Sequence, residues 1–394
     1  MIRVAFTLFC LILVSTAAAA KPDLPVNWHG LPEPYASPSA VNPPLVVPRP
    51  PGAKLTLPPG FAVSEWMGDL PGARYMTLGP GGEVLVALMH VGKVAVVHDG
   101  QVRIILDHLH DPYGLAFDGD WLYVAETTSV KRYHYDAATM RVDGPGKEVI
   151  PLEDYAGGHI TRSIMFNKSH TKLFLSVGSG SNINTGEPPM RAAISRFNPD
   201  GSSGEIYASG LRNAIGLRIN PVTGDLWATV QERDTMGDDL VPDYLTRVVE
   251  GGFYGWPYAY IGPHEDPHHP GAAPDLVKKT LYPSVILGGH VGAFDLLFYT
   301  GKQFPAKYRG GCFVVEHGSW NRSRRAGYKI VFVPFKDGKP TSGPEDFLTG
   351  WMLGEDRLQV WGRPISLLQL PDGSLLISDD GGDKIWRVTY APPS

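Results

Sequence analysis

Hydrophobic residues between positions 60 and 390 recur as short paired runs. In each pair, a first run is followed by a turn rich in glycine, proline, aspartate or asparagine, and then by a run rich in valine, leucine, phenylalanine or tryptophan. Short apolar runs separated by such turns predict β-hairpins. The pairs occupy residues 74–88, 113–126, 162–178, 214–230, 293–318 and 363–380.

Each pair is followed by another strand, as at residues 93–98, 327–335 and 383–390. A repeat of about 40–50 residues with about four strands is the signature of a β-propeller. We therefore predict an all-β, six-bladed β-propeller over residues 59–394. The last blade would be shared with the first strands after Leu57, which closes the ring. Two β-sandwich domains are the alternative, which a repeat disfavours.

Composition agrees with this picture. The 46 glycines and 36 prolines interrupt the chain too often for long helices. The polar, glycine-rich segments near residues 180–192 and 255–290 are expected to be loops on a binding face. Binding of nucleic acid usually requires a basic surface, which a net charge of −5 does not indicate. We therefore expect no nucleic-acid partner.

Residues 1–20 have the composition of a signal peptide. Arg3 precedes an almost wholly apolar run from Val4 to Val14, and Ala18 to Ala20 supply a cleavage site. The run is too short to span a membrane, so we expect a periplasmic or secreted protein without stable membrane insertion. Residues 21–58 are proline-rich and predict an extended N-terminal arm.

His159 is the first candidate for chemistry. It lies immediately before a predicted strand and follows Gly157 and Gly158, which allow the backbone to pass close to a ligand. A histidine at the rim of a sheet can act as a general base near neutral pH. The alternative is a surface or capping histidine.

Arginines stand at similar places in other repeats. Arg212, followed by Asn213, precedes one strand pair, and Arg162 and Arg363 begin two others. Arginines converging on one end of a propeller would bind an anion with several carboxylates or phosphates. Arg322 and Arg325 are expected on the same side. The alternatives are pairing with inter-blade acids and unrelated surface arginines.

An acidic segment follows the strand that ends near Val230. Residues 231–234 read Gln-Glu-Arg-Asp, and Asp238 and Asp239 follow. Oxygen-rich loops suit Ca²⁺, although the spacing is not that of an EF-hand. A solvated acidic loop is the alternative. His264, His268 and His269 lie on another loop without a known metal-ligand spacing, and we interpret this loop as solvated.

Several long motifs resemble one known family. Residues 210–260, 316–335 and 362–380 are similar to the soluble pyrroloquinoline quinone (PQQ) dependent sugar dehydrogenases. The sorbosone dehydrogenase-like branch is the most similar, beside soluble glucose dehydrogenase. The resemblance covers roughly residues 55–390 and implies a six-bladed propeller. It also implies an oxidoreductase that oxidises an aldose or related sugar at C1 to a lactone or acid by hydride transfer to PQQ.

The resemblance also implies roles for single residues. His159 would be the general base, and Arg212 would contact the quinone oxygen. Asn213, His290, Arg322, Arg325 and Arg363 would join them around PQQ, whose three carboxylates explain the arginines. The backbone carbonyls of Glu232 and Arg233 would hold a Ca²⁺ that polarises the quinone. Electrons would pass to an external acceptor, a cytochrome or a quinone.

The chain departs from the glucose enzymes in places. Trp361 replaces a second arginine, and Glu232 and Arg233 replace a Gly-Pro pair. Two other functions remain alternatives. One is a Ca²⁺-dependent propeller lactonase or other hydrolase. The other is a non-catalytic propeller that binds a sugar or a protein.

Overall fold

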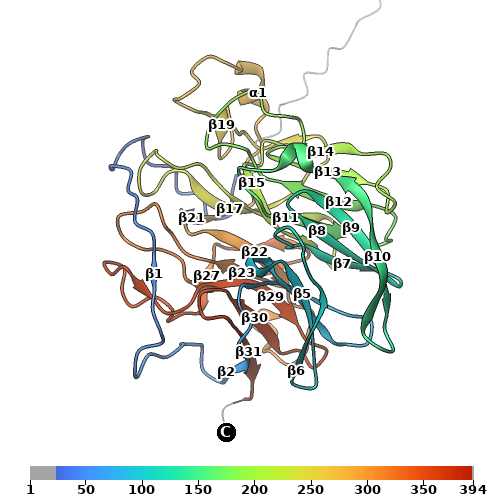
Figure 1. Ribbon diagram of the computed structural model, residues 1–394. Coiled ribbons are helices and arrows are strands. Elements are labelled where there is room, and N and C mark those ends of the chain that lie inside the picture. The colour runs from blue at the N-terminus through green and yellow to red at the C-terminus, as the bar shows by residue number, and fades with distance from the viewer. Residues whose placement is uncertain (1–23, 393–394) are drawn as a thin grey trace, which may run out of the picture.

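The computed structural model describes residues 24–392, so the predicted signal peptide at residues 1–20 lies outside the described part. The described chain is nearly all β and forms a six-bladed β-propeller (Figure 1). Each blade is an antiparallel sheet of four strands, and the third blade gains a fifth, parallel strand. The predicted fold is confirmed, and the two-sandwich alternative is wrong because the hairpins fall into six separate sheets.

The first three blades follow the chain in order. The first contains β3 (Ala73–Leu78), β4 (Val84–Leu88), β5 (Lys93–His98) and β6 (Gln101–Leu106). The second contains β7 (Leu115–Asp118), β8 (Trp121–Glu126), β9 (Ser129–Asp136) and β10 (Arg141–Pro151). The third contains β11 (Arg162–Phe166), β12 (Leu173–Val177), β13 (Ala193–Phe197), β14 (Glu205–Ser209) and β18 (Gly252–Phe253).

The other three blades complete the ring. The fourth contains β15 (Asn213–Ile219), β16 (Leu226–Gln231), β17 (Pro242–Arg247) and β21 (Val285–Gly289). The fifth contains β22 (Ala293–Phe298), β23 (Cys312–Glu316), β24 (Lys329–Val333) and β27 (Glu345–Leu348). The sixth contains β29 (Pro364–Gln369), β30 (Leu375–Asp379), β31 (Lys384–Tyr390) and β2 (Phe61–Met67).

The sixth blade joins the two ends of the propeller. β2 pairs antiparallel with β31, so a strand from the start of the described chain forms the outer edge of the last sheet. Phe61 on β2 contacts the rings of Phe304 and Phe347 in the fifth blade. This confirms the predicted closure of the ring and adds an aromatic contact between neighbouring blades.

Burial explains why the second strand of each repeat is so apolar. Every residue of β4, β12, β23 and β30 is buried, because these strands are covered on both faces by neighbouring blades. The outer strands, such as β6, are largely exposed. The core is therefore a set of apolar layers between blades and not one central cluster.

The innermost strands surround the axis and position the candidate site. β3, β7, β11, β15, β22 and β29 contact one another in a closed ring. Since the blades are arranged alike, these strands all begin at the same end of the propeller. β3, β15, β22 and β29 each carry a bulge near that end. Bulges redirect side chains and are frequent beside functional sites.

Polar side chains fill the axis below that end. Asp295 on β22 is fully buried and accepts hydrogen bonds from Arg218 on β15, at 2.8 Å, and from the hydroxyl of Ser366 on β29, at 2.8 Å. Arg218 also donates to the Tyr75 hydroxyl on β3, at 2.6 Å. One buried carboxylate therefore links four blades.

Two segments lie outside the blades. Residues 24–58, which we call the N-terminal arm, run along the surface and contain only β1 (Leu45–Val46), which pairs with β28 (Gln359–Val360). The other segment joins β18 to β21 and projects from the ring (Figure 1). It contains β19 (Ala259–Tyr260), β20 (His264–Glu265) and α1 (Pro274–Lys279). The loop expected at residues 255–290 therefore has short regular elements, and its last residues belong to the fourth blade.

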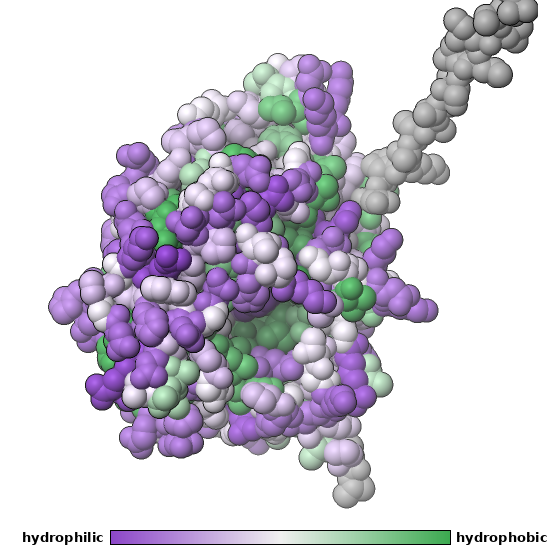
Figure 2. All heavy atoms as spheres, turned by 90° about the vertical axis from the view of Figure 1, so that its right-hand side faces the viewer, coloured by the Kyte–Doolittle hydropathy of each residue, from purple (hydrophilic) through white to green (hydrophobic). Residues whose placement is uncertain are grey.

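The remaining elements are short. β25 (Phe335–Lys336) and β26 (Lys339–Pro340) form a small hairpin in the fifth blade, and single 3₁₀ turns occupy Met89–Val91, Glu153–Tyr155 and Ala306–Tyr308. Within residues 24–392, no helix has the length and apolar character needed to cross a membrane. The face shown in Figure 2 is largely hydrophilic around a hollow with hydrophobic residues inside it.

Candidate active site

A cavity of about 280 Å³ opens at the end of the propeller where the innermost strands begin. Its lining residues stand at strand entries or follow the second strands of the blades. They are Arg74, His159, Arg212, Gln231, Glu232, Asp234, Asp243, His290, Gly292, Phe294, His317, Gly318, Trp320, Asn321 and Arg363. The lining contains cations, acids and aromatic rings but few aliphatic side chains. This composition is typical of a catalytic site and not of a void in the core.

Glycines create the space in which His159 lies. Gly158 has a φ of +61°, and a Cβ on it would lie 2.5 Å from the Cα of Gly180. A Cβ on Gly178 would lie 2.7 Å from the Cβ of His159. The glycines thus allow a close approach between protein segments around the histidine, and side chains at Gly158 and Gly178 would displace it.

The hydrogen bonding of His159 fixes its tautomer. Nδ1 lies 2.8 Å from the carbonyl oxygen of Ser179, so Nδ1 carries the proton and donates it. Nε2 has no hydrogen-bond partner within residues 24–392 and is free to accept a proton. Burial, followed by the positive charge of Arg212, lowers the pKa of His159 to about 4. The imidazole is therefore neutral at pH 7.

Arg212 is held at the other side of this part of the cavity. Only 6% of it is exposed. Its Nη1 donates to the carbonyl of Glu232 at 2.7 Å, and its Nη2 pairs with Asp234 at 3.2 Å and with the Asn182 side chain at 2.9 Å. These contacts immobilise the guanidinium before any ligand arrives.

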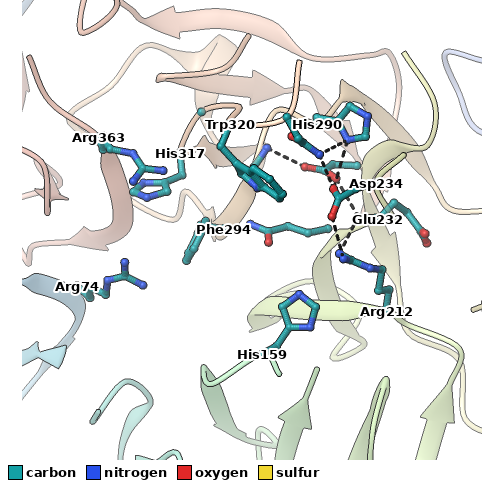
Figure 3. Close-up of a pocket in the computed structure, with 15 residues that line it drawn as sticks. Arg74, His159, Arg212, Glu232, Asp234, His290, Phe294, His317, Trp320 and Arg363 are labelled. Carbon is teal, nitrogen blue, oxygen red and sulfur yellow. Dashed lines mark hydrogen bonds and ion pairs between the residues drawn. The ribbon is translucent and has the colours of Figure 1, made fainter. Parts of the chain in front are cut away.

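Asp234 continues this network toward His290. The Asn321 side-chain amide donates to the Asp234 carboxylate and lies 3.1 Å from His290 Nδ1 (Figure 3). His290 Nε2 lies 2.9 Å from the carbonyl of Gly237. Both ring nitrogens of His290 therefore have hydrogen-bond partners within the protein.

A second group of cations lies across the cavity. Arg74 pairs with Asp380 at 2.8 Å, and its Nε is buried without a partner. The guanidinium of Arg363 makes no ion pair or hydrogen bond with any described residue, and its Nε is also buried. Two guanidinium groups that share one carboxylate leave an excess of positive charge here, which suits an anionic ligand.

His317 completes the second group. Its Nδ1 lies 2.8 Å from the carbonyl of Pro364, and its Nε2 lies 3.8 Å from Asp380. Burial, followed by the charge of Arg363, lowers the pKa of His317 to about 3. The neutral ring adds a polar contact to this side of the cavity without adding charge.

Two aromatic rings lie between the two groups (Figure 3). Phe294 packs against His317, with ring centroids 4.7 Å apart. Trp320 is 47% exposed, although most tryptophans of the described chain are buried. An exposed indole at a cavity provides a flat surface on which a ring system or a sugar can stack.

Four of the residues predicted from sequence to bind the cofactor line this cavity. They are His159, Arg212, His290 and Arg363. Asn213 lies behind the lining, where its amide donates to the Gln231 side chain at 3.1 Å and its Oδ1 is buried without a partner. Gln231 therefore faces the cavity, and Asn213 supports it.

Three arginines expected near the ligand do not line the cavity. Arg325 donates to the backbone carbonyls of Asn42, at 2.9 Å, and Pro43, at 3.0 Å. Arg322 donates to the carbonyl of Asp238 at 2.7 Å and pairs with Asp239. Arg162 is fully buried and donates to the His159 carbonyl at 2.6 Å. Each guanidinium is used to hold a loop, because backbone carbonyls surround it.

Other expected features also differ from their interpretation. Trp361 is a core residue packed on Trp351 and Trp386, and Arg74 supplies the second cation that Trp361 lacks. The three loop histidines are partly buried, and each has its own partner: His264 the carbonyl of Ile261, His268 the carboxylate of Asp266, and His269 the carbonyl of Ile183. Their loop is therefore packed and not fully solvated.

The Glu232–Arg233 segment is more buried than a solvated acidic loop. Arg233 is fully buried and pairs with Asp266 and Glu232. Its side chain thereby attaches the projecting segment to the cavity. Within residues 24–392, no three acidic, histidine or cysteine side chains form a group that could hold a metal ion.

Sequence reasoning missed Arg74, His317 and Trp320 as lining residues. A signal existed for Arg74, because it begins its repeat as Arg162 and Arg363 begin theirs. Glu316 ends the second strand of the fifth blade, as Gln231 ends that of the fourth, and His317 follows directly after Glu316. Trp320 had no comparable signal, since the loop that carries it differs between the blades. Asp234 lies in the acidic segment that the sequence singled out for a cation, but its pairing with Arg212 was not predicted.

Comparison with known proteins now adds to the geometry. Residues 55–242 match the model of the TrAA12-like family. The chain is 27% identical over 354 residues to an uncharacterised protein of Borreliella burgdorferi, covering 85% of this chain and 91% of that protein. It is 23% identical over 402 residues to the PQQ-dependent pyranose dehydrogenase of Coprinopsis cinerea, covering 84% of this chain and 54% of that enzyme.

The structure of the PQQ domain of the Coprinopsis cinerea pyranose dehydrogenase, in its holo form, matches with a TM-score of 0.72 and 21% identity. The match covers 89% of this chain and the whole of that domain. Homologues and structural neighbours of the chain are PQQ-dependent sugar dehydrogenases. The resemblance found in the sequence motifs is thus confirmed. The chain spans about half the length of the curated Coprinopsis enzyme.

Proposed function

We propose that this protein is a PQQ-dependent sugar dehydrogenase that oxidises an aldose or related sugar at C1, giving a lactone or an acid. The observation that carries the proposal is the cavity itself, in which a neutral histidine with a free Nε2 faces an arginine cluster without enough acidic partners. The relatedness to PQQ-dependent enzymes supports the same cofactor.

The residues present fit PQQ, a planar quinone with three carboxylates. Arg363 and the free Nε of Arg74 would pair with carboxylates, and Trp320 and Phe294 would contact the ring faces. Arg212 and His290 would hold the opposite edge. When bound, PQQ supplies the two-electron acceptor that receives the hydride.

His159 is proposed as the general base. Its Nδ1–H is held by Ser179, so Nε2 would accept the proton of the C1 hydroxyl as the C–H bond breaks. The lowered pKa keeps this nitrogen unprotonated at neutral pH. Arg212, already fixed by Asp234 and the Glu232 carbonyl, would stabilise negative charge that develops beside it.

We further propose that Ca²⁺ binds at the backbone carbonyls of Glu232 and Arg233, where it would act as a Lewis acid. Two features of this region suit a cation. Glu232 has a buried side-chain oxygen without a partner, and Asp234 and Asp243 add negative charge to the same part of the cavity. The Glu232 carbonyl already accepts from Arg212, so its second lone pair would serve the ion.

Electrons would pass from PQQ to an external acceptor, a cytochrome or a quinone. The protein would act in the periplasm or outside the cell, which agrees with the signal-peptide composition of residues 1–20. Residues 21–58 would be an arm attached to the propeller domain of residues 59–394.

Titration of the purified protein with PQQ, with and without Ca²⁺, tests the proposal when absorbance and melting temperature are both recorded. We expect a Ca²⁺-dependent spectral change and a higher melting temperature, followed by dye reduction with at least one aldose. Absence of PQQ binding under both conditions would overturn the proposal in favour of a hydrolase or a binding propeller. Equal binding without Ca²⁺ would remove only the metal.

The base is tested by His159→Gln. We expect kcat to fall by about 10²-fold or more, the usual contribution of a positioned base, with PQQ still bound. His110→Gln is the control, because His110 is exposed and lies outside the cavity. Unchanged kcat in the His159 variant would rule out its role as the base.

A further inference from the structure

The N-terminal arm contacts two loops that form the cavity. One is the loop of residues 318–325, which carries Trp320 and Asn321. The other is the loop of residues 234–239, which carries Asp234. Three cavity-lining side chains, those of Asp234, Trp320 and Asn321, therefore stand on loops that the arm contacts.

Asn42 is the main contact between the arm and the first loop. Its backbone N–H donates to the carbonyl of Trp320 at 2.7 Å. Its side-chain amide donates to the carbonyls of Arg322, at 3.0 Å, and Ser323, at 3.2 Å. Its Oδ1 accepts from Arg325 at 3.0 Å. One residue of the arm thus binds four residues of the loop.

The second loop is held in a similar way. The N–H of Tyr35 donates to the carbonyl of Met236 at 2.9 Å, and the Ser37 hydroxyl accepts from the N–H of Asp238 at 2.8 Å. Asp238 in turn accepts from the N–H of Ser323 at 2.9 Å. The arm and the two loops therefore form one hydrogen-bonded unit.

This unit ends in the cavity. Asn321, on the loop that Asn42 holds, donates to Asp234, and Asp234 pairs with Arg212. The half-exposed Trp320 has its backbone carbonyl fixed by Asn42 and its indole ring directed into the cavity (Figure 3). A loop displacement of about 1 Å is enough to impair a preorganised site.

From these contacts we infer that Asn42 is a positioning residue, which fixes Trp320 and Asn321 at the cavity and makes the N-terminal arm part of the construction of the site. This inference rests on the proposed function for its effect on catalysis. Its structural content, the ordering of residues 319–325, is independent of that function.

The arm offers a matched control. Asn27 also bonds the backbone through its side chain, donating to the carbonyl of Ile286 at 2.8 Å and accepting from its N–H at 3.0 Å. Ile286 lies on β21 and does not line the cavity. Asn27→Ala therefore removes an arm contact of the same kind without touching the cavity loops.

The experiment compares Asn42→Ala, Asn42→Asp and Asn27→Ala. With Asn42→Ala we expect faster hydrogen exchange over residues 319–325 and a Kd for PQQ, or a KM for the sugar, raised on the order of tenfold. Asn42→Asp keeps the acceptor for Arg325 but loses both side-chain donors, so its effect should be intermediate. Asn27→Ala should leave all three quantities unchanged, even where its melting temperature falls.

Equal behaviour of Asn42→Ala and Asn27→Ala would overturn the inference. Failure of the wild-type protein to bind PQQ would overturn the proposed function instead, and the exchange comparison would still decide the role of Asn42. If Asn42→Ala does not fold, Asn42→Asp provides the same comparison.

Discussion

At the scale of residues, the cavity divides its charges between two sides. His159 and Arg212 stand on one side, where Arg212 pairs with Asp234 and the lowered pKa of His159 removes its charge. Arg74 and Arg363 stand on the other, with one carboxylate, Asp380, between them. The excess positive charge is therefore local. A ligand that carries several carboxylates would be oriented by this difference before any catalytic contact forms.

Arg363 tests this division of charge. We expect Arg363→Leu to raise the Kd for PQQ by about 10–100-fold, because a charge-assisted hydrogen bond to a carboxylate is worth about 1.5–3 kcal/mol. Fluorescence or absorbance titration measures the change. Arg141→Leu, at an exposed residue outside the cavity, should bind PQQ as the wild type does. Wild-type affinity in Arg363→Leu would show that this guanidinium does not meet the ligand.

At the scale of elements, the site depends on the entry of each innermost strand. The turn that leads into β11 places two glycines before His159, both in the left-handed region. Arg162 and Arg191 hold this turn through its own carbonyls, including those of Tyr155 and Gly157. The histidine is thus fixed by backbone contacts behind it, and its free nitrogen needs no protein partner in front.

The two glycines provide a paired test. Gly157 has a φ of +80° with open space around it, whereas a Cβ on Gly158 would meet the backbone of Gly180. Gly157→Ala should cost about 1 kcal/mol of unfolding free energy through strain at positive φ. Gly158→Ala should cost more and should also lower kcat, since the turn must move. Denaturant unfolding and dye reduction separate the two effects, and equal losses in both variants would contradict the steric argument.

At the scale of the whole molecule, buried polar groups join the blades. Asp295 connects four innermost strands, and Asp243 accepts from the backbone of Glu232 in the fourth blade and of Gly292 in the fifth. Burial raises the pKa of Asp243 to about 6. Near neutral pH, the titrations of Asp243 and His317 therefore change the free energy of unfolding in opposite directions. Single variants must be compared at more than one pH.

His317 gives the clearest case of such a titration. Folding lowers the pKa of His317 from 6.5 to about 3. Between these pH values, the unfolded chain binds a proton at His317 and the folded chain does not. The stability linked to His317 is complete above about pH 6.5 and is lost as the pH falls toward 3. Between pH 7 and pH 5 the loss is about 2 kcal/mol by linkage.

His317→Gln should therefore destabilise the protein less at pH 5 than at pH 7, by about 2 kcal/mol. Urea unfolding of wild type and variant at both pH values measures the difference, which cancels the opposite contribution of Asp243. Gln101→Ala, at an exposed residue without a titratable side chain, should show equal costs at both pH values. An equal cost for His317→Gln at both pH values would mean that its ring is not kept neutral by burial.

The repeats allowed the fold to be predicted almost completely. Six hairpins around glycine- and aspartate-rich turns gave six blades, and the apolar strand near residue 385 needed a partner from the other end of the chain. Site residues just before innermost strands, such as Arg363, could be located, because the repeat places the start of every innermost strand at the same end of the propeller. Arg322 and Arg325 could not, since their direction depends on an arm about 280 residues earlier in the chain whose path has no periodic pattern.

The closure of the ring has a consequence for synthesis. β2 pairs with β31, so the sixth blade is complete only when β31 has left the ribosome. Until then, β2 has no sheet partner, and Phe61 lacks the ring of Tyr390 on β31. Synthesis of the propeller thus passes through an incomplete ring with exposed edges until β31 has emerged, a state on which chaperones can act.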